Sequence, residues 1–118
     1  LEWAQAYEQN LTYFIESIRQ EFDLPNMPFV IGQISDSEVW TYGDIVQQAQ
    51  YNVSQTVPRT AMVYTSDLER NDYHYINDGV LTLGSRFAEA MMDIPRSGTA
   101  DLNGDGIVDF IDLAIFLN

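Results

Sequence analysis

The sequence of 118 residues contains no cysteine and no lysine, and it has only one histidine. Without cysteine the chain forms no disulfide, and thiol catalysis and a cysteine-based zinc site are excluded. Its five basic residues are all arginines and face 18 acidic residues, so the formal net charge is -13. That charge has the wrong sign for neutralising nucleic-acid phosphates or for lying on an anionic membrane. We therefore expect no nucleic-acid partner.

Long apolar runs are also missing. No stretch approaches the roughly 20 apolar residues that a membrane-spanning helix needs, so we expect no membrane insertion. The composition is nonetheless that of a folded protein, because 46% of the residues are hydrophobic and 13% are aromatic. This apolar content is enough for the packed core of one small domain.

Apolar residues recur with helical spacing in three segments, and short apolar runs lie between them. The helical stripes span residues 7–22, 42–53 and 80–91, and the apolar runs span residues 28–34 and 60–65. Pro25 and Pro58 follow the first two stripes and end them, and Asp78 is the expected N-cap of the third. A polar loop, residues 66–77, separates the second apolar run from the third stripe.

The alternation of helices with short, continuous apolar strands predicts an α/β fold with parallel strands that are buried on both faces. Two such strands are too few to stand alone, because their edges and part of their faces stay uncovered. We therefore expect residues 1–92 to be the carboxyl-terminal part of a larger three-layer α/β/α sheet domain, whose remainder lies upstream. Residues 93–100 mix Pro, Gly, Ser and Thr without periodicity and are predicted to be a linker.

The segment after this linker has the spacing of a calcium-binding loop of the EF-hand type. A hard cation takes six to eight oxygens at roughly 2.3 to 2.6 Å, and glycine at the sixth position allows the sharp bend that turns alternate residues inward. Gly106 occupies that position. The predicted ligands, with Ile107 contributing its backbone carbonyl, are Asp101, Asn103, Asp105, Ile107, Asp109 and Asp112. The alternative is an acidic turn that is simply solvated.

Apolar spacing continues after the loop, so residues 101–118 are predicted to form a loop-then-helix unit. The run DLNGDGIVDFIDLAIFL resembles one repeat of a type I dockerin. The resemblance implies calcium binding and a cohesin-like or cell-surface partner. Dockerins normally carry two repeats, whereas one is present here, and Phe110 and Ile111 replace residues that are often small and hydroxylated. An extracellular location is inferred, because free calcium outside cells is high enough to fill a weak loop of this kind.

The single histidine, His74, lies in the polar loop that follows the second predicted strand. Active sites of open α/β sheets lie at the carboxyl ends of the strands, which is where such a loop begins. A histidine there, with acidic neighbours, is suited to act as a general base toward a serine hydroxyl. A lone histidine is otherwise commonly structural.

Several runs of the sequence resemble the sialate O-acetylesterase-related and acetylxylan-esterase-like branch of the SGNH hydrolases. They are PFVIGQ at 28–33, VPRTAMVYTSDL at 57–68, HY at 74–75 and LGSRFAEAM at 83–91. The resemblance implies a flavodoxin-like sheet domain, a serine esterase mechanism and a secreted bacterial enzyme that removes acetyl groups from polysaccharides or sialic acids.

In that family an Asp-x-x-His motif near the end supplies the histidine, which His74 matches. Asn71 stands at the position of the motif's aspartate, and the candidate acid is therefore Asp72, with Asp67 as the weaker alternative. The family's nucleophilic serine comes from an earlier block. No serine here has that setting, and the serines expected to serve as turns, caps and surface hydroxyls are Ser35, Ser37, Ser54, Ser66, Ser85 and Ser97.

Two functions remain open at this point. The chain is either the carboxyl-terminal part of a secreted carbohydrate O-acetylesterase with a calcium-binding tail, or a non-catalytic calcium-dependent assembly module on a degenerate esterase scaffold. Gly32 ends the first strand and either lines a cleft or relieves close packing. The aromatic residues Trp3, Trp40, Tyr73 and Tyr75 either stack on sugar rings or belong to the core.

Overall fold

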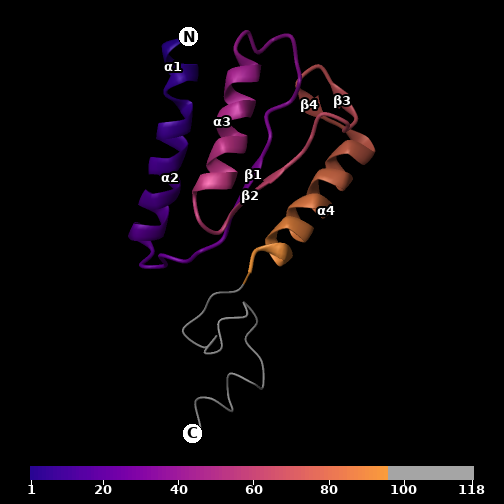
Figure 1. Ribbon diagram of the computed structural model, residues 1–118. Coiled ribbons are helices and arrows are strands. Elements are labelled where there is room, and N and C mark those ends of the chain that lie inside the picture. The colour runs from indigo at the N-terminus through magenta and orange to yellow at the C-terminus, as the bar shows by residue number, and fades with distance from the viewer. Residues whose placement is uncertain (96–118) are drawn as a thin grey trace, which may run out of the picture.

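A computed structural model describes residues 1–95 as helices around a small sheet (Figure 1). The elements are α1 (Glu2–Gln5), α2 (Tyr7–Glu21), β1 (Phe29–Gly32), α3 (Gly43–Thr56), β2 (Thr60–Val63), β3 (Arg70–Asn71), β4 (His74–Tyr75) and α4 (Asn77–Asp93). The predicted linker from residue 96 onward and the whole predicted calcium loop lie outside the described residues.

The central pair of strands is parallel, as predicted. β1 pairs with β2 so that Phe29 lies opposite Thr60 and Gly32 lies opposite Val63. Helix α3 is the crossover between them and packs on β2 and α2, whereas α4 contacts both strands. Figure 1 shows α2 and α3 on one side of the strands and α4 on the other. The described residues are therefore a mixed α/β unit with helices on both faces of the parallel pair.

The apolar core lies between α2, α3 and the strand pair. Ile15 of α2 and Val53 of α3 are fully buried and meet Ile31 of β1. Their spacing in the sequence is the reason, because residues on one helical stripe face the same layer. The stripe predicted for α2 is wider than the face that is buried, since Phe14 and Phe22 are exposed.

Two details differ from the prediction. The segment expected to be an irregular loop contains the antiparallel hairpin of β3 and β4, in which Asn71 pairs with His74. The expected N-cap is also wrong, because α4 begins at Asn77 and its first turn has no side-chain cap. Backbone contacts hold this turn instead: the Gly79 N–H donates to Ile76 O at 2.9 Å, and the Ile76 N–H donates to Glu69 O at 3.1 Å.

Candidate active-site region

The candidate site lies where the chain leaves the carboxyl ends of β1 and β2. Two glutamines of α3 fix the exit of β1. The buried Gln50 amide donates to Gly32 O at 3.1 Å and accepts from the Ile34 N–H at 2.8 Å. Gln47 donates to Ile34 O at 2.9 Å and to the carboxylate of Asp36. Side chains of the crossover helix therefore position the loop that follows β1.

The exits of the two strands are also bound to each other. Thr65, which is fully buried, donates its backbone N–H to Gln33 Oε1 at 3.2 Å and its hydroxyl to Gln33 O at 3.1 Å. A Cβ on Gly32 would lie 2.9 Å from Cζ of Phe87 on α4. Close packing against α4 is therefore the reason for glycine at this position.

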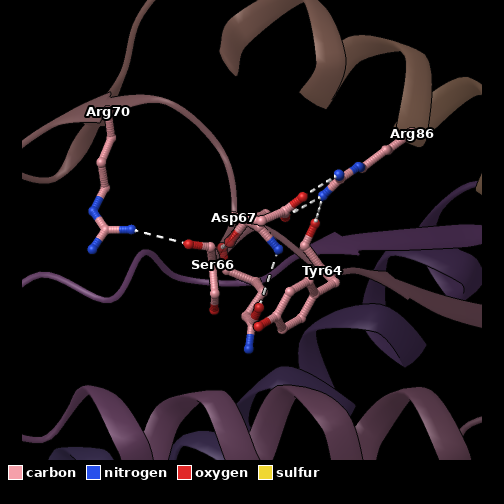
Figure 2. Close-up of polar contacts among 7 residues, drawn as sticks. Tyr64, Ser66, Asp67, Arg70 and Arg86 are labelled. Atoms are coloured by element: carbon pink, nitrogen blue, oxygen red, sulfur yellow. Dashed lines mark hydrogen bonds and ion pairs between the residues drawn. The ribbon is translucent and has the colours of Figure 1, made fainter.

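An arginine network ties the loop after β2 to its surroundings (Figure 2). Arg86 of α4 donates to Tyr64 O at 2.7 Å. It also donates to both carboxylate oxygens of Asp67, at 2.7 and 2.6 Å. The hydrogen bond from Arg86 holds the pKa of the Asp67 carboxyl below its usual range. Arg70 donates to Ser66 O at 3.4 Å and to Asp36 O at 2.9 Å. Both carboxylate oxygens of Asp67, the weaker candidate for the triad acid, are thus bound by an arginine of α4.

Serine hydroxyls connect the hairpin to the loop after β1. Ser37 donates to Asp72 Oδ1 at 2.7 Å, and Ser35 donates to Tyr73 O at 3.3 Å. Asp72 and Tyr73 form the turn of the hairpin, and Asp72 has the left-handed φ of 57°. The carboxylate of Asp72 therefore anchors the turn to a segment 35 residues earlier in the chain.

His74 follows this turn as the first residue of β4, and its side chain is exposed. Its ring lies against that of Tyr73, with 4.2 Å between the centroids. Asn71, at the position of the motif's aspartate, is directly across the hairpin. Within residues 1–95 the imidazole forms no hydrogen bond, either with Asp72 or Asp67 or with a serine hydroxyl. The catalytic roles of His74 and Asp72 therefore stay predictions.

Two functional candidates were missed in the sequence. Ser35 and Ser37 were expected to serve as turns, caps or surface hydroxyls, and Ser37 does accept the Val39 N–H at 3.3 Å. Both residues, however, are only 4% and 8% exposed and support the hairpin that carries His74. The sequence gives one weak local indication that these serines belong to the site, because Ser35, Asp36 and Ser37 follow directly after an apolar strand. Their partners in the hairpin, however, cannot be read from local spacing.

The described part of the chain shows neither a metal centre nor a membrane span. No three histidine, aspartate or glutamate side chains in residues 1–95 come together as metal ligands would. None of the helices in the same range is long and apolar enough to cross a bilayer. The six predicted calcium ligands all lie beyond this range, so calcium binding stays a prediction.

Comparison with known proteins identifies the first four-fifths of the chain. Residues 1–93 match the family model described as SASA, carbohydrate esterase, sialic acid-specific acetylesterase. No curated protein and no solved structure matches the chain. The match includes both parallel strands, the hairpin with His74 and nearly all of α4.

Proposed function

Because the chain belongs to the carbohydrate esterase family of sialic acid-specific acetylesterases, we propose that it is the carboxyl-terminal part of a secreted bacterial carbohydrate O-acetylesterase with a three-layer, flavodoxin-like α/β/α domain. The observation that carries the proposal is the position of His74. The only histidine of the family-matched segment is exposed on a hairpin that is anchored at the carboxyl ends of both parallel strands. This is the edge at which open α/β sheets bind their substrates.

In the proposed reaction, His74 removes the proton from a serine hydroxyl as that oxygen attacks the acetyl carbonyl. The imidazolium then protonates the departing sugar oxygen, which leaves an acetyl-serine that water hydrolyses in a second, equivalent step. The nucleophile is proposed to come from a segment outside these 118 residues. In support, Ser35 and Ser37 are buried, and their hydroxyls donate to hairpin oxygens instead of to His74.

Asp72 is the proposed acid of this triad. Ser37 engages only Oδ1 of Asp72, whereas Arg86 engages both oxygens of Asp67. Asp72 therefore keeps one oxygen with which to orient an imidazole two residues away, and Asp67 does not. The two side chains are not hydrogen-bonded to each other among residues 1–95, but catalytic hydrogen bonds commonly tighten only when substrate is bound.

The decisive test is His74→Ala in the esterase that contains this chain. Turnover of para-nitrophenyl acetate and acetylated xylan should fall by about three or more orders of magnitude, because removing a triad histidine eliminates proton transfer. The melting temperature should change little, since His74 is exposed and, within residues 1–95, its side chain has a ring contact with Tyr73 but no hydrogen bond. Retained turnover in the folded variant would remove His74 from the mechanism.

One observation favours the second candidate, a non-catalytic assembly module on a degenerate scaffold. Asn71 replaces the motif's aspartate, and neither candidate acid hydrogen-bonds His74 among the described residues. The same assay separates the two functions, because a degenerate scaffold would show no turnover that depends on His74.

In either case we propose that residues 101–118 are a single dockerin-like repeat that binds calcium and attaches the protein to a cohesin-like or cell-surface partner. The regular spacing of its oxygen-bearing residues supports this proposal. Calorimetry should show heat on calcium addition to the wild type and none with Asp105→Ala. Asp78→Ala, a matched loss of one carboxylate outside the loop, should titrate as the wild type does. Equal titrations of the wild type and Asp105→Ala would exclude the site.

A further inference from the structure

Three rings form a row at the candidate site. They are the rings of Trp40 and Tyr73 and the imidazole of His74, the candidate catalytic histidine. Trp40, from the loop after β1, packs edge to face against Tyr73 with 5.3 Å between the centroids, and Tyr73 lies against His74 at 4.2 Å. Trp40 and Tyr73 remain 37% and 40% exposed. These rings meet across the two loops at the carboxyl ends of the strands, so they are not part of the core between α2, α3 and the sheet.

The row is held in place through polar contacts on its inner side. The indole N–H of Trp40 donates to Ser35 Oγ at 3.2 Å, and this hydroxyl donates to the backbone carbonyl of Tyr73 at 3.3 Å. Ser35 is 4% exposed, so both contacts are shielded from water. The backbone of Trp40 is fixed as well, because its N–H donates to Ser37 O at 3.0 Å and its carbonyl accepts from the Gly43 N–H at 2.9 Å. The indole N–H of Trp40 and the backbone carbonyl of Tyr73 are therefore bonded on the inner side, while part of both rings is left to solvent.

Such an arrangement suits the binding of a sugar ring. The apolar C–H face of a pyranose packs on an aromatic ring, and a ring fixed in advance loses little conformational entropy when the ligand arrives. Trp3 provides the contrast. It is 86% exposed on the short helix α1, with no ring contact or side-chain hydrogen bond among the described residues.

The charge around this row selects among sugars. Asp36, Glu38 and Asp72 lie on the same two loops, whereas Arg70 is the one arginine there and donates to the carbonyls of Ser66 and Asp36. The excess of acids agrees in sign with the net charge of -13 for the whole chain. A ligand that carries its own carboxylate, such as a sialic acid, is repelled by this field, whereas an uncharged acetylated sugar is not.

We infer that Trp40 and Tyr73 form a stacking platform for an uncharged acetylated sugar, which places its ester beside His74, and that sialic acids are poor ligands of this platform. The inference rests on the proposed esterase function and extends it by naming the substrate class and the residues that bind it. It concerns binding, and it is therefore measurable without turnover.

The chain has two tryptophans, which allows a direct fluorescence test. In the full chain with Trp3→Phe, Trp40 is the single indole, and its emission should change saturably on titration with acetylated xylo-oligosaccharide. In the matched chain with Trp40→Phe, the emission of Trp3 should not change. N-acetylneuraminic acid, at the same concentrations, should bind Trp40 at least about tenfold more weakly at low salt, with the difference shrinking as salt screens the acids.

A second set of variants separates stacking from folding. In the Trp3→Phe background, Tyr73→Phe should keep the affinity for the oligosaccharide, because the ring remains, whereas Tyr73→Ala should weaken it about tenfold. Melting temperatures show whether each variant is folded. In the esterase, Trp40→Ala should raise KM for acetylated xylan, whereas Trp40→Phe, which keeps an aromatic ring, should raise it less.

Three results would overturn the platform: no response of Trp40, equal responses of Trp40 and Trp3, or tighter binding of the sialic acid than of the neutral sugar. These are distinct from failure of the esterase proposal. If Trp40 binds the neutral sugar but His74→Ala retains turnover, the platform stands and the catalytic assignment fails. If Trp40 gives no response while His74→Ala abolishes turnover, the platform fails and the catalytic assignment stands.

Discussion

At the scale of single residues, the carboxylate of Asp72 is assigned two roles, which are to anchor the hairpin and to orient His74. Its hydrogen bond from Ser37 anchors the hairpin, whereas orienting His74 requires the other oxygen. A carboxylate that accepts one hydroxyl at 2.7 Å still has lone pairs for a second donor. The anchoring duty is visible in the geometry, and the catalytic duty is a hypothesis that a pair of substitutions can separate.

Asp72→Asn and Ser37→Ala both change the anchor, but only the first changes a group that can orient His74. If Asp72 is the triad acid, Asp72→Asn should lower kcat by about three orders of magnitude or more, as wrong-tautomer variants do. Ser37→Ala should lower it only a few fold, with a loss of about 1 kcal/mol of stability from the hydrogen bond. Turnover and melting temperature of both variants, measured in the esterase, decide the matter. Similar kcat values for the two would leave Asp72 with an anchoring role only.

The ion pair of Asp67 with Arg86 predicts how stability depends on pH. The folded-state pKa of Asp67 is lowered by Arg86, so the unfolded chain takes up the proton first as the pH falls. The contribution of the pair to the free energy of unfolding is therefore complete above the usual carboxyl pKa of 3.8 and is lost as the pH falls through the lower folded value. The melting temperature of the wild type should drop across this range, and Asp67→Asn and Arg86→Gln should flatten the same part of the profile. An unchanged profile in both variants would show that the pair contributes nothing.

At the scale of elements, the start of α4 depends on a glycine. A Cβ on Gly79 would lie 2.1 Å from the backbone carbonyl oxygen of Glu69, a contact that no side-chain rotation relieves. The same residue is buried where the first turn of α4 meets the backbone just before β3. The hairpin that carries His74 and the helix that follows it are thus packed backbone against backbone.

Gly79→Ala should therefore separate α4 from the hairpin and lower stability by about 2 kcal/mol or more, within the range of overpacked sites. The matched substitution is Gly84→Ala on the same helix. Gly84 is exposed, and nothing lies within 4 Å of the position that a Cβ would take there. Alanine at this position should stabilise the chain by up to about 1 kcal/mol through helix propensity. Chemical denaturation measures both variants, and the same sign of change for the two would contradict the packing argument.

The larger elements were predictable from the sequence because each repeats one physical pattern. Helices α2, α3 and α4 follow apolar stripes of helical period, and β1 and β2 coincide with short apolar runs. The hairpin was missed because each of its strands has two residues and its turn uses Asp72 at a left-handed φ instead of a glycine. The N-cap at Asp78 was misplaced because backbone contacts set the start of α4, through the close approach of Gly79 to Glu69.

The candidate site could be predicted only where its parts are neighbours in the sequence. His74 was predicted from the motif and Asp72 as the acid one residue from the motif's aspartate position, and both lie in the hairpin. The hydrogen bond of Ser37 with Asp72 and the ring contact of Trp40 with Tyr73 join segments that are far apart in the chain. Such pairings arise from the parallel crossover, which brings two loops to one edge of the sheet, and no local pattern encodes them.

At the scale of the whole molecule, the described residues leave much apolar surface uncovered. β1 and β2 pair with each other, and no further strand of residues 1–95 pairs with their outer edges. On α4, Leu81 and Met92 are 70% and 69% exposed. They are separated by about three helical turns, so they share one face of the helix. Unpaired edges and exposed apolar faces favour association.

We therefore predict that the isolated chain self-associates at raised concentration and melts over a broad range. The net charge of -13 opposes contact between copies, so association should increase as salt screens the repulsion. Sedimentation velocity at low and high salt measures this dependence. Leu81→Glu together with Met92→Glu should reduce association if the face of α4 is the contact, and should leave it unchanged if the strand edges are. A monomer at every salt concentration with a sharp melting transition would contradict this prediction. The exposed apolar surface would then be too small a cost to cause self-association or broad melting.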